Sequence, residues 1–147
     1  MADRTESSIL VEAAPADVLA VVADFADYPS WAGAVRSTEV LSTGPGGRPE
    51  QVKFTLDAGA IRDTYVLAYV WDLAPDGQGE LSWSLIEASI VKAMDGAYRL
   101  AAATGGTRVT YTLFVDLRVP MLGMLRRKAE KVIIDTALNE LKKRVEQ

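Results

Sequence analysis

The carboxy-terminal part of the chain shows most clearly how the protein is built. Residues 109–146 run VTYTLFVDLRVPMLGMLRRKAEKVIIDTALNELKKRVE. Apolar residues alternate with mostly polar ones as far as Leu117, and this period of two is typical of a half-buried β-strand. Pro120 ends the run, and the apolar residues of 121–146 then recur at helical spacing. The stretch therefore predicts a strand that leads into one long helix.

The residues before this stretch carry the same period of two in several further runs. The runs lie within residues 52–56, 65–71, 81–85 and 94–100. Glycine-containing turn signals separate the runs, at 44–47 (GPGG), 75–79 (PDGQG) and 105–106 (GG). Consecutive strands joined by short turns form an antiparallel meander, so we expect one antiparallel sheet.

The amino-terminal part predicts a strand and two short helices ahead of this meander. Ser8–Ala13 indicates the strand, and Pro15 favours a helix start, so we expect helices over Ala16–Tyr28 and Pro29–Val35. The order of strand, helix pair, about six strands and long helix is that of an α+β protein. We expect a single domain over residues 1–147, in which a curved antiparallel sheet of about seven strands surrounds the long helix and leaves a cavity between them.

The composition excludes several kinds of chemistry. The chain contains no histidine and no cysteine, so Ser-His-Asp and Cys-His arrangements, thiolate chemistry and Cys/His zinc sites are excluded. The 16 basic and 20 acidic residues give a net charge of −4, and the basic excess is confined to residues 120–147. An acidic body of this kind argues against nucleic-acid binding. We expect neither a metal nor a cofactor.

The amino terminus and the apolar runs bear on the location of the protein. Residues 1–8 (MADRTESS) lack the basic and apolar regions of a signal peptide. No apolar run approaches the ~18 residues that a membrane-spanning helix needs. A cytoplasmic protein without a transmembrane segment is therefore expected.

Several local stretches, in this order along the chain, resemble a known family. They are ILVEAAPADV at 9–18, DFADYPSW at 24–31, GTRVTY at 106–111 and the Val119-Pro120 pair before the long helix. Together they resemble the START-like superfamily, also called SRPBCC, and within it the polyketide cyclase/dehydrase and coenzyme Q-binding-protein-like branch. The resemblance implies a helix-grip fold, as in START and Bet v 1-like proteins, around an apolar pocket. It also implies a hydrophobic ligand such as a lipid, a polyketide or a quinone, and only some members of the superfamily are enzymes.

One face of the predicted sheet carries aromatic rings with polar groups, which are typical of a small-molecule site. The candidate ligand-binding residues on the strands are Phe54, Asp63, Tyr65, Tyr69, Trp71, Trp83, Tyr98 and Tyr111. Trp31, Met121, Leu122 and Leu125 are expected to border the entrance. Burial of the ligand's apolar surface would drive binding, and the tyrosine hydroxyls and Asp63 would orient the ligand. An ordinary packed core uses the same aromatic residues, and that alternative stays open.

A second hypothesis is an enzyme, namely a cyclase or dehydratase that acts on a polyketide-like substrate through aspartate and tyrosine. The resemblance implies that the aromatic cyclases of the family use an arginine and a tyrosine inside the cavity. Here Arg62 and Arg99 alternate onto the face opposite the tyrosines, which argues against that chemistry. The expected hairpin places Leu67 opposite Glu87, so Glu87 and Asp63 lie more than ~10 Å apart and cannot form a coupled pair of carboxylates.

A third hypothesis is a lipid-delivery or partner-binding module. Arg126, Arg127, Lys128 and Lys131 lie in the first half of the predicted long helix and could contact anionic lipid or an acidic protein weakly. Glu130 and Asp135 lie among them, so a solvated helix face accounts for the same pattern.

Overall fold

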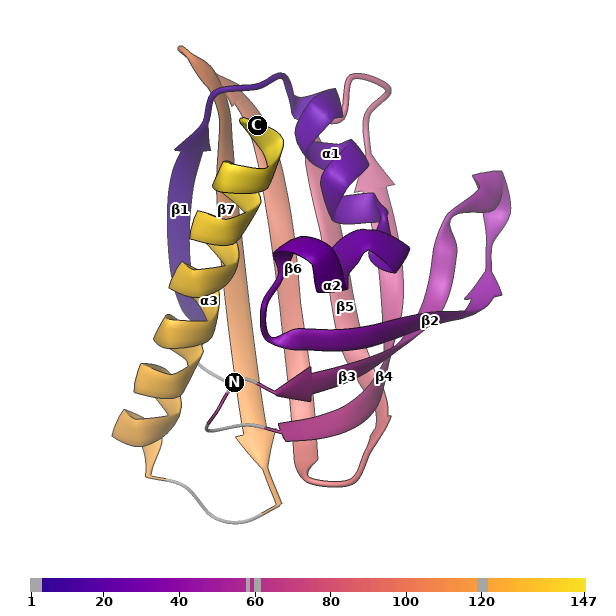
Figure 1. Cartoon of the computed structure of the whole chain (residues 1–147), viewed down its shortest axis with the longest axis vertical. Coiled ribbons are helices and arrows are strands. Elements are labelled where there is room, and N and C mark those ends of the chain that lie inside the picture. The colour runs from indigo at the N-terminus through magenta and orange to yellow at the C-terminus, as the bar shows by residue number, and fades with distance from the viewer. Residues whose placement is uncertain (1–3, 58, 60–61, 119–121) are drawn as a thin grey trace.

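The computed structural model describes residues 4–57, 59, 62–118 and 122–147, and Figure 1 shows the order of the elements. The first strand is followed by short helices: β1 (Thr5–Val11), α1 (Pro15–Ala23), a 3₁₀ helix (Phe25–Asp27) and α2 (Tyr28–Trp31). The remaining strands are β2 (Val35–Thr43), β3 (Pro49–Asp57), β4 (Arg62–Leu73), β5 (Gly79–Ala88), β6 (Val91–Ala103) and β7 (Gly106–Leu117). A second 3₁₀ helix (Pro45–Gly47) links β2 to β3, and the long helix is α3 (Gly123–Val145).

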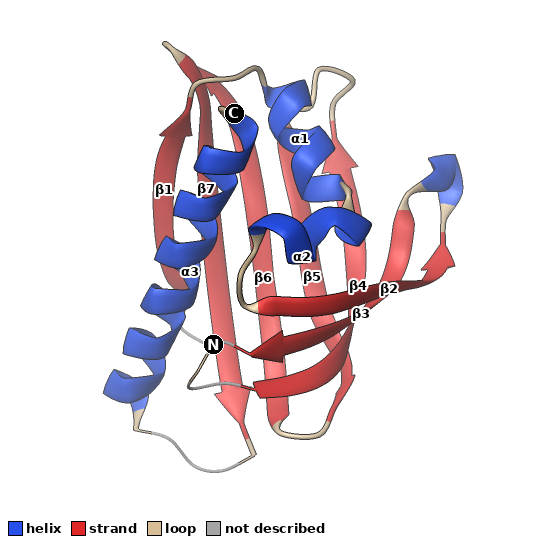
Figure 2. Cartoon of the chain, in the orientation of Figure 1, coloured by secondary structure: helices blue, strands red, loops and turns tan. Residues whose placement is uncertain are grey.

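The strands of the described residues form one seven-stranded sheet in the order β1-β7-β6-β5-β4-β3-β2. Every neighbouring pair is antiparallel. Figure 2 shows the helices on one side of the sheet, with β2 and β3 turned sharply away from the direction of β6 and β7. This confirms the predicted α+β class, in which a curved antiparallel sheet surrounds a long carboxy-terminal helix and short helices follow the first strand.

The alternation of the sequence explains which side of the sheet is buried. In β7 the odd-numbered residues from Thr107 to Val115 are buried, whereas the even-numbered residues are exposed or half-buried. Successive side chains of a strand point to opposite faces, so this period of two selects one inner face. The same alternation buries Val52, Phe54 and Leu56 on β3. The inner face therefore forms the concave side against which the helices pack.

The long helix α3 lies across β1 and β7, as Figure 1 shows, and also contacts α1. Its buried apolar side chains are Ile134, Leu138 and Leu141, which lie at the spacing of one helical face. The residue before the helix, Leu122, makes no side-chain cap to the first turn. The helix is therefore held mainly by its apolar face and not by a capping residue.

A buried carboxylate also joins α3 to the sheet. Glu130 is fully buried, and its Oε1 accepts a hydrogen bond from Thr5 Oγ1 at 2.6 Å. Its Oε2 accepts from the backbone N–H of Val115 at 2.7 Å and pairs with Arg126 Nη1 at 3.2 Å. The pairing of β1 with β7 ends at Leu113, so Glu130 satisfies a β7 N–H beyond the last residue paired with β1.

The predicted boundaries need small corrections. The first helix ends at Ala23 and not at Tyr28, because the chain turns through the 3₁₀ helix, and the second helix covers Tyr28–Trp31 instead of Pro29–Val35. Glu87 pairs with Val66 rather than Leu67, because the ladder between β4 and β5 shifts register after Val66. No helix of the described residues has the length and apolar character needed to cross a membrane.

Candidate functional site

A cavity of about 180 Å³ lies between the concave face of the sheet, α3 and the segment that joins α2 to β2. The sheet contributes Val35, Phe54, Leu56, Tyr65, Leu67, Tyr69, Trp83, Met94, Tyr98, Tyr111 and Leu113. The helices and the α2–β2 connection contribute Tyr28, Trp31, Ala32, Ala34, Val132, Ile133, Thr136, Ala137 and Glu140. The lining is thus mostly apolar and aromatic, with a few polar groups, as is usual for sites that bind small organic molecules.

The structure brings most of the predicted ligand-binding residues together around this cavity. The predicted residues that line it are Trp31, Phe54, Tyr65, Tyr69, Trp83, Tyr98 and Tyr111. All of them except Trp31 lie on strands, and the alternation of those strands directs their side chains to the inner face. Each of the chain's five tyrosines lines the cavity, including Tyr28, which the sequence had indicated only as a helix end.

The aromatic rings form a connected wall. Trp83 lies 5.5 Å, centroid to centroid, from both Tyr98 and Tyr111, and these two tyrosines lie 4.6 Å apart. On the other side Phe54 stacks on Tyr65 at 5.6 Å. Ring contacts at these distances stabilise the wall beyond the burial of area alone. The cavity is therefore bounded by side chains that hold one another in place.

The tyrosine hydroxyls fall into two groups. Tyr28 donates a hydrogen bond to the backbone carbonyl of Val22 at 2.5 Å. The hydroxyls of the other cavity tyrosines, namely Tyr65, Tyr69, Tyr98 and Tyr111, have no hydrogen-bond partner among the described residues. The indole N–H of Trp31 is also buried and unpartnered within that part of the chain. The unpaired tyrosine hydroxyls, which line an apolar cavity, are available to a ligand.

Burial controls the ionisation of these tyrosines. It is the main cause that raises the pKa of Tyr65, Tyr69, Tyr98 and Tyr111 above the ordinary value of a phenol. In Tyr65, Tyr69 and Tyr98 the proximity of Tyr111 raises the pKa further. The phenols therefore remain protonated near neutral pH, where they can donate hydrogen bonds but cannot act as bases.

Glu140 is the charged residue that the sequence reasoning missed. Its side chain belongs to α3 and lines the cavity, and its Oε2 accepts a hydrogen bond from the backbone N–H of Gly33 at 3.1 Å. Ile133, Ala137 and Glu140 lie at the i, i+4 and i+7 positions of one helical face. That spacing was the signal in the sequence, because it places a carboxylate on an otherwise apolar stripe.

Asp63 is not part of the cavity lining, contrary to the prediction. Its carboxylate accepts hydrogen bonds from the backbone N–H groups of Ile90 and Val91 at 2.8 and 2.9 Å, so it holds the turn between β5 and β6. Burial opposes ionisation of Asp63, but the hydrogen bonds from Val91, Ile90, Thr64 and Ser89 outweigh it and lower the pKa. The carboxylate is used structurally, at the start of β4.

Trp71 also lies outside the lining, although it shares the strand face of Tyr69. Its Nε1 donates to the backbone carbonyl of Pro49 at 2.7 Å, and the Arg48 guanidinium lies 4.9 Å from its ring centroid. The ring of Phe25 contacts both Tyr69 and Trp71, at 4.8 and 6.2 Å between centroids. Trp71 therefore anchors the β2–β3 hairpin instead of facing the cavity.

The predicted entrance residues are placed differently from expectation. Leu122 and Leu125 are 75% and 55% exposed, and neither lines the cavity, because α3 reaches the cavity only from Val132 onward. Met121 lies outside the described residues. Of the predicted entrance residues, Trp31 alone among those described lines the cavity.

The arginines on the sheet point away from the cavity, as the alternation indicated. Arg62 is exposed and pairs with Asp57 at 3.1 Å, and Arg99 is exposed and pairs with Glu80 at 3.2 Å. Neither guanidinium can therefore contact a ligand in the cavity. In the described part of the chain no group of acidic side chains is arranged to hold a metal ion.

The basic residues of α3 are partly used within the protein. Arg126 pairs with Glu130 and stacks over Phe114 at 4.7 Å, and Lys131 pairs with Asp135 at 2.8 Å. Arg127 and Lys128 are exposed. The predicted contact of these side chains with lipid or protein remains a prediction.

Three solved structures share this fold over nearly the whole chain. A START superfamily protein from Mycobacterium smegmatis has a TM-score of 0.88 at 19% identity and covers 98% of this chain and 97% of its own. The ZhuI aromatase/cyclase from Streptomyces sp. R1128 has a TM-score of 0.74 at 19% identity, and the match covers 98% of this chain and 93% of the cyclase. A STAR-related lipid transfer protein from Xanthomonas axonopodis has a TM-score of 0.76 at 16% identity, and the match covers 97% of this chain and 85% of the transfer protein.

The sequence itself also matches a family. No curated protein matches the chain. Residues 2–146, in contrast, match the family described as "Polyketide cyclase / dehydrase and lipid transport". This match covers the sheet, the long helix and every residue of the cavity lining. The chain therefore belongs to the polyketide cyclase/dehydrase and lipid transport family.

Proposed function

We propose that this protein binds a hydrophobic small molecule in the cavity between its sheet and α3. The observation that carries the proposal is a cavity of about 180 Å³ whose wall presents unpaired tyrosine hydroxyls. An apolar cavity of roughly 150 Å³ is large enough to hold benzene. A ligand with one or two aromatic rings matches the space, and longer ligands would extend through the side formed by α3 and the α2–β2 connection.

Two kinds of interaction would hold such a ligand. Each Å² of apolar ligand surface removed from water contributes about 25 cal/mol. A hydrogen bond from a tyrosine hydroxyl contributes about 0.5–1.5 kcal/mol and fixes orientation. The unpaired hydroxyls therefore favour a ligand that carries a carbonyl or hydroxyl oxygen, which includes the lipid, polyketide and quinone classes expected from the sequence.

Fluorescence titration with a defined probe tests the proposal, because Trp83 and Trp31 line the cavity. The probe is 2-acetylnaphthalene, a neutral bicyclic ketone. We expect saturable quenching in the wild type and at least a tenfold loss of affinity in Ala137→Leu, which fills space in the cavity. Ala20→Leu makes the same change at an exposed position of α1, outside the cavity lining, and is the matched control. Equal affinity in all three proteins would contradict binding in the cavity.

An enzyme is the less favoured function. A cyclase or dehydratase needs a group that takes up a proton, and the tyrosines of the cavity retain theirs. Asp63 is bound to the β5–β6 turn, so among the described lining residues Glu140 is the carboxylate that catalysis would have to use. If the protein turns over a polyketide-like ketone, Asp63→Asn should retain the activity and Glu140→Gln should abolish it. The reverse result would contradict this assignment.

A second candidate function is docking to an anionic lipid surface through the first turns of α3. Leu122, Met124 and Leu125 are 75%, 76% and 55% exposed, beside the exposed Arg127 and Lys128. Apolar and basic side chains together are what an interfacial helix uses. Sedimentation with phosphatidylserine vesicles should be lost in R127E/K128E and in high salt. Vesicle binding that persists in the variant would contradict this docking function.

A cytoplasmic location of the protein stays a prediction.

A further inference from the structure

We infer that Glu140 makes the cavity selective for uncharged ligands with a hydrogen-bond acceptor, such as aromatic ketones, over carboxylates of the same shape. This selectivity rests on the proposed function, since it requires a ligand in the cavity. It narrows the ligand class, because it excludes fatty acids and aromatic acids in their ionised form.

The charged groups of the cavity lining disfavour an anionic ligand. Among the described residues that line the cavity there is no lysine and no arginine, and Glu140 is the one charged residue. A carboxylate that enters an apolar cavity loses its hydration, and this loss is offset only when a cation or several hydrogen bonds take its place. The described lining residues offer an anionic ligand no cation, and the carboxylate of Glu140 already lies in the same wall.

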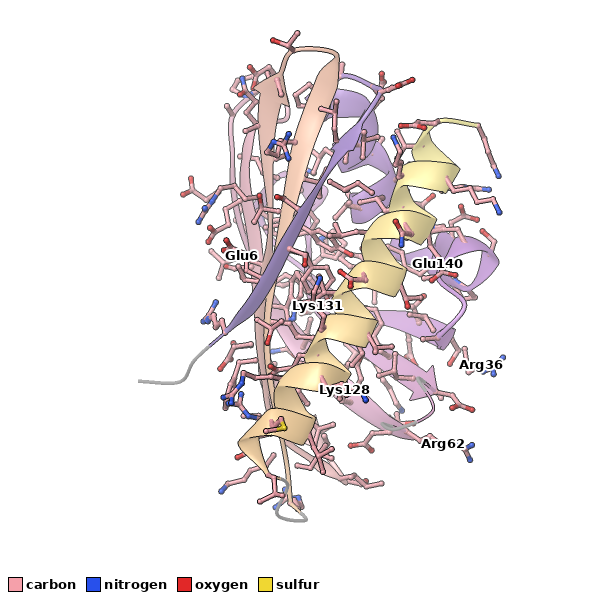
Figure 3. The ribbon with its side chains drawn as sticks, turned by 90° about the vertical axis from the view of Figure 1, so that its left-hand side faces the viewer. Glu6, Arg36, Arg62, Lys128, Lys131 and Glu140 are labelled. Carbon is pink, nitrogen blue, oxygen red and sulfur yellow. The ribbon has the colours of Figure 1, made fainter. Side chains whose placement is uncertain are left out.

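The position of Glu140 is fixed by the backbone. Its Oε2 lies 3.1 Å from the N of Gly33, in the connection between α2 and β2, and a Cβ atom on Gly33 would lie only 3.2 Å from the same oxygen. Figure 3 shows Glu140 on the side of α3 that faces the short helices. The carboxylate is thus held between two elements of the wall and does not simply extend into solvent.

The charge of Glu140 also acts across the cavity. Burial is the main cause of the raised pKa of Tyr98, and Tyr111, Tyr28 and Glu140 raise this pKa further. Glu140 therefore disfavours negative charge at the Tyr98 hydroxyl. An anionic ligand group placed beside Tyr98 would experience the same repulsion, whereas a carbonyl oxygen would accept the hydroxyl hydrogen bond without it.

The basic residues near this side of the protein do not reverse the argument. Arg144, one helical turn after Glu140 on α3, pairs with Asp27 at 2.6 Å. Arg36 and Lys128 are labelled in Figure 3, and none of these three residues lines the cavity. The Arg36 side chain is 64% exposed and lies 3.8 Å from Asp57, so water and an acidic partner screen its charge. These cations can attract an anion to the surface, but they cannot replace its hydration inside the cavity.

The test compares two probes of matched shape, 2-acetylnaphthalene and 2-naphthoate, by calorimetric titration at pH 7.5. We expect the wild type to bind the ketone at least tenfold more tightly. Glu140→Gln keeps an oxygen that accepts the Gly33 hydrogen bond but removes the charge. In this variant the affinity for 2-naphthoate, relative to the affinity for the ketone, should rise about tenfold.

Asp135→Asn is the matched control, because it removes a carboxylate from the same helix outside the cavity lining. Its ratio of the two affinities should equal that of the wild type. Equal binding of both probes to the wild type, or an unchanged ratio in Glu140→Gln, would overturn the selectivity while leaving the proposed function intact. Failure of the wild type and all variants to bind either probe would overturn the proposed function itself. The ratio in the wild type is informative even if a variant folds poorly.

Discussion

The indole of Trp83 lies directly against Gly96, its partner across β5 and β6. A Cβ atom on Gly96 would lie 2.5 Å from Cζ2 of Trp83 and 2.8 Å from the carbonyl oxygen of Thr112. The absence of a side chain at residue 96 therefore leaves the space that the Trp83 ring occupies. This relationship gives the first prediction.

Gly96→Ala should lower the free energy of unfolding by about 1–3 kcal/mol, because the added methyl forces the Trp83 ring or the backbone to move. Urea denaturation measures the change. The same substitution in a Trp83→Phe background separates the two contacts, since phenylalanine removes the Cζ2 atom. A smaller loss in that background assigns the clash to Trp83. An equal loss would show that the Thr112 carbonyl is the obstacle and would contradict the role given to the ring.

Glu130→Ala should destabilise the protein strongly. The substitution leaves the Val115 N–H and the Thr5 hydroxyl without their acceptor and Arg126 without its buried partner, which costs about 3–5 kcal/mol for a buried pair. Thermal and urea unfolding measure the loss. Asp135→Asn, which removes an exposed ion pair on the same helix, should change the stability by less than about 1 kcal/mol. A similar effect of the two substitutions would contradict the role of Glu130 as a buried link.

Tyrosine-to-phenylalanine substitutions should separate structural hydroxyls from those available to a ligand. Tyr28→Phe removes the hydrogen bond to Val22 and should lower the free energy of unfolding by about 1 kcal/mol. Tyr98→Phe removes a hydroxyl with no described partner, so stability should be unchanged or higher, whereas the affinity for 2-acetylnaphthalene should fall several-fold. Denaturation and calorimetry together check this. A stable Tyr28→Phe with a destabilised Tyr98→Phe would contradict the assignment.

The tyrosines also predict the behaviour of the protein at high pH. Their raised pKa values mean that the folded state keeps phenol protons that the unfolded state releases above pH ~10. The stability they contribute is complete below pH ~10 and falls as the pH rises further. Phenolate absorbance should therefore appear together with unfolding measured by circular dichroism. Phenolate formation in the folded protein at its ordinary pKa would contradict burial of the hydroxyls.

Asp63 predicts the opposite dependence at low pH. Its pKa is lowered in the folded state, so its contribution to stability is complete above the unfolded-state pKa of about 3.9 and is lost as the pH falls through the folded-state value. Asp63→Asn should lower the free energy of unfolding at pH 7. Between pH 5 and 3 the variant should then lose less stability than the wild type does. Asp72→Asn, an exposed position on the same strand, is the control. An unchanged acid profile in Asp63→Asn would contradict the hydrogen bonds to the β5–β6 turn.

The sequence was sufficient for the architecture because alternation is a local property. The odd-numbered residues from Thr107 to Val115 show the buried face of β7 directly, and the same pattern placed Tyr65, Tyr98 and Trp83 on the inner face. Once one long helix covers such a face, these residues must lie between the sheet and the helix.

The sequence was insufficient where tertiary contacts decide which residues of one strand face reach the cavity. Trp71 and Asp63 share the strand face of Tyr65, but Phe25 packs against Trp71 and the β5–β6 turn binds Asp63. Glu140 was missed because the rotation of α3 about its axis depends on its packing against β1 and β7. Leu122 and Leu125 were placed at the entrance because the sequence does not tell which turn of the helix meets the cavity.

The location of a bound ligand tests the central claim most directly. Solution NMR of the protein with 2-acetylnaphthalene can report which methyl groups lie beside the aromatic protons of the ligand. We predict intermolecular contacts to Met94, Leu113 and Ile133, which line the cavity. Contacts confined to Met124 and Leu125, the exposed methyl-bearing residues at the start of α3, would place the ligand on the surface and contradict the claim.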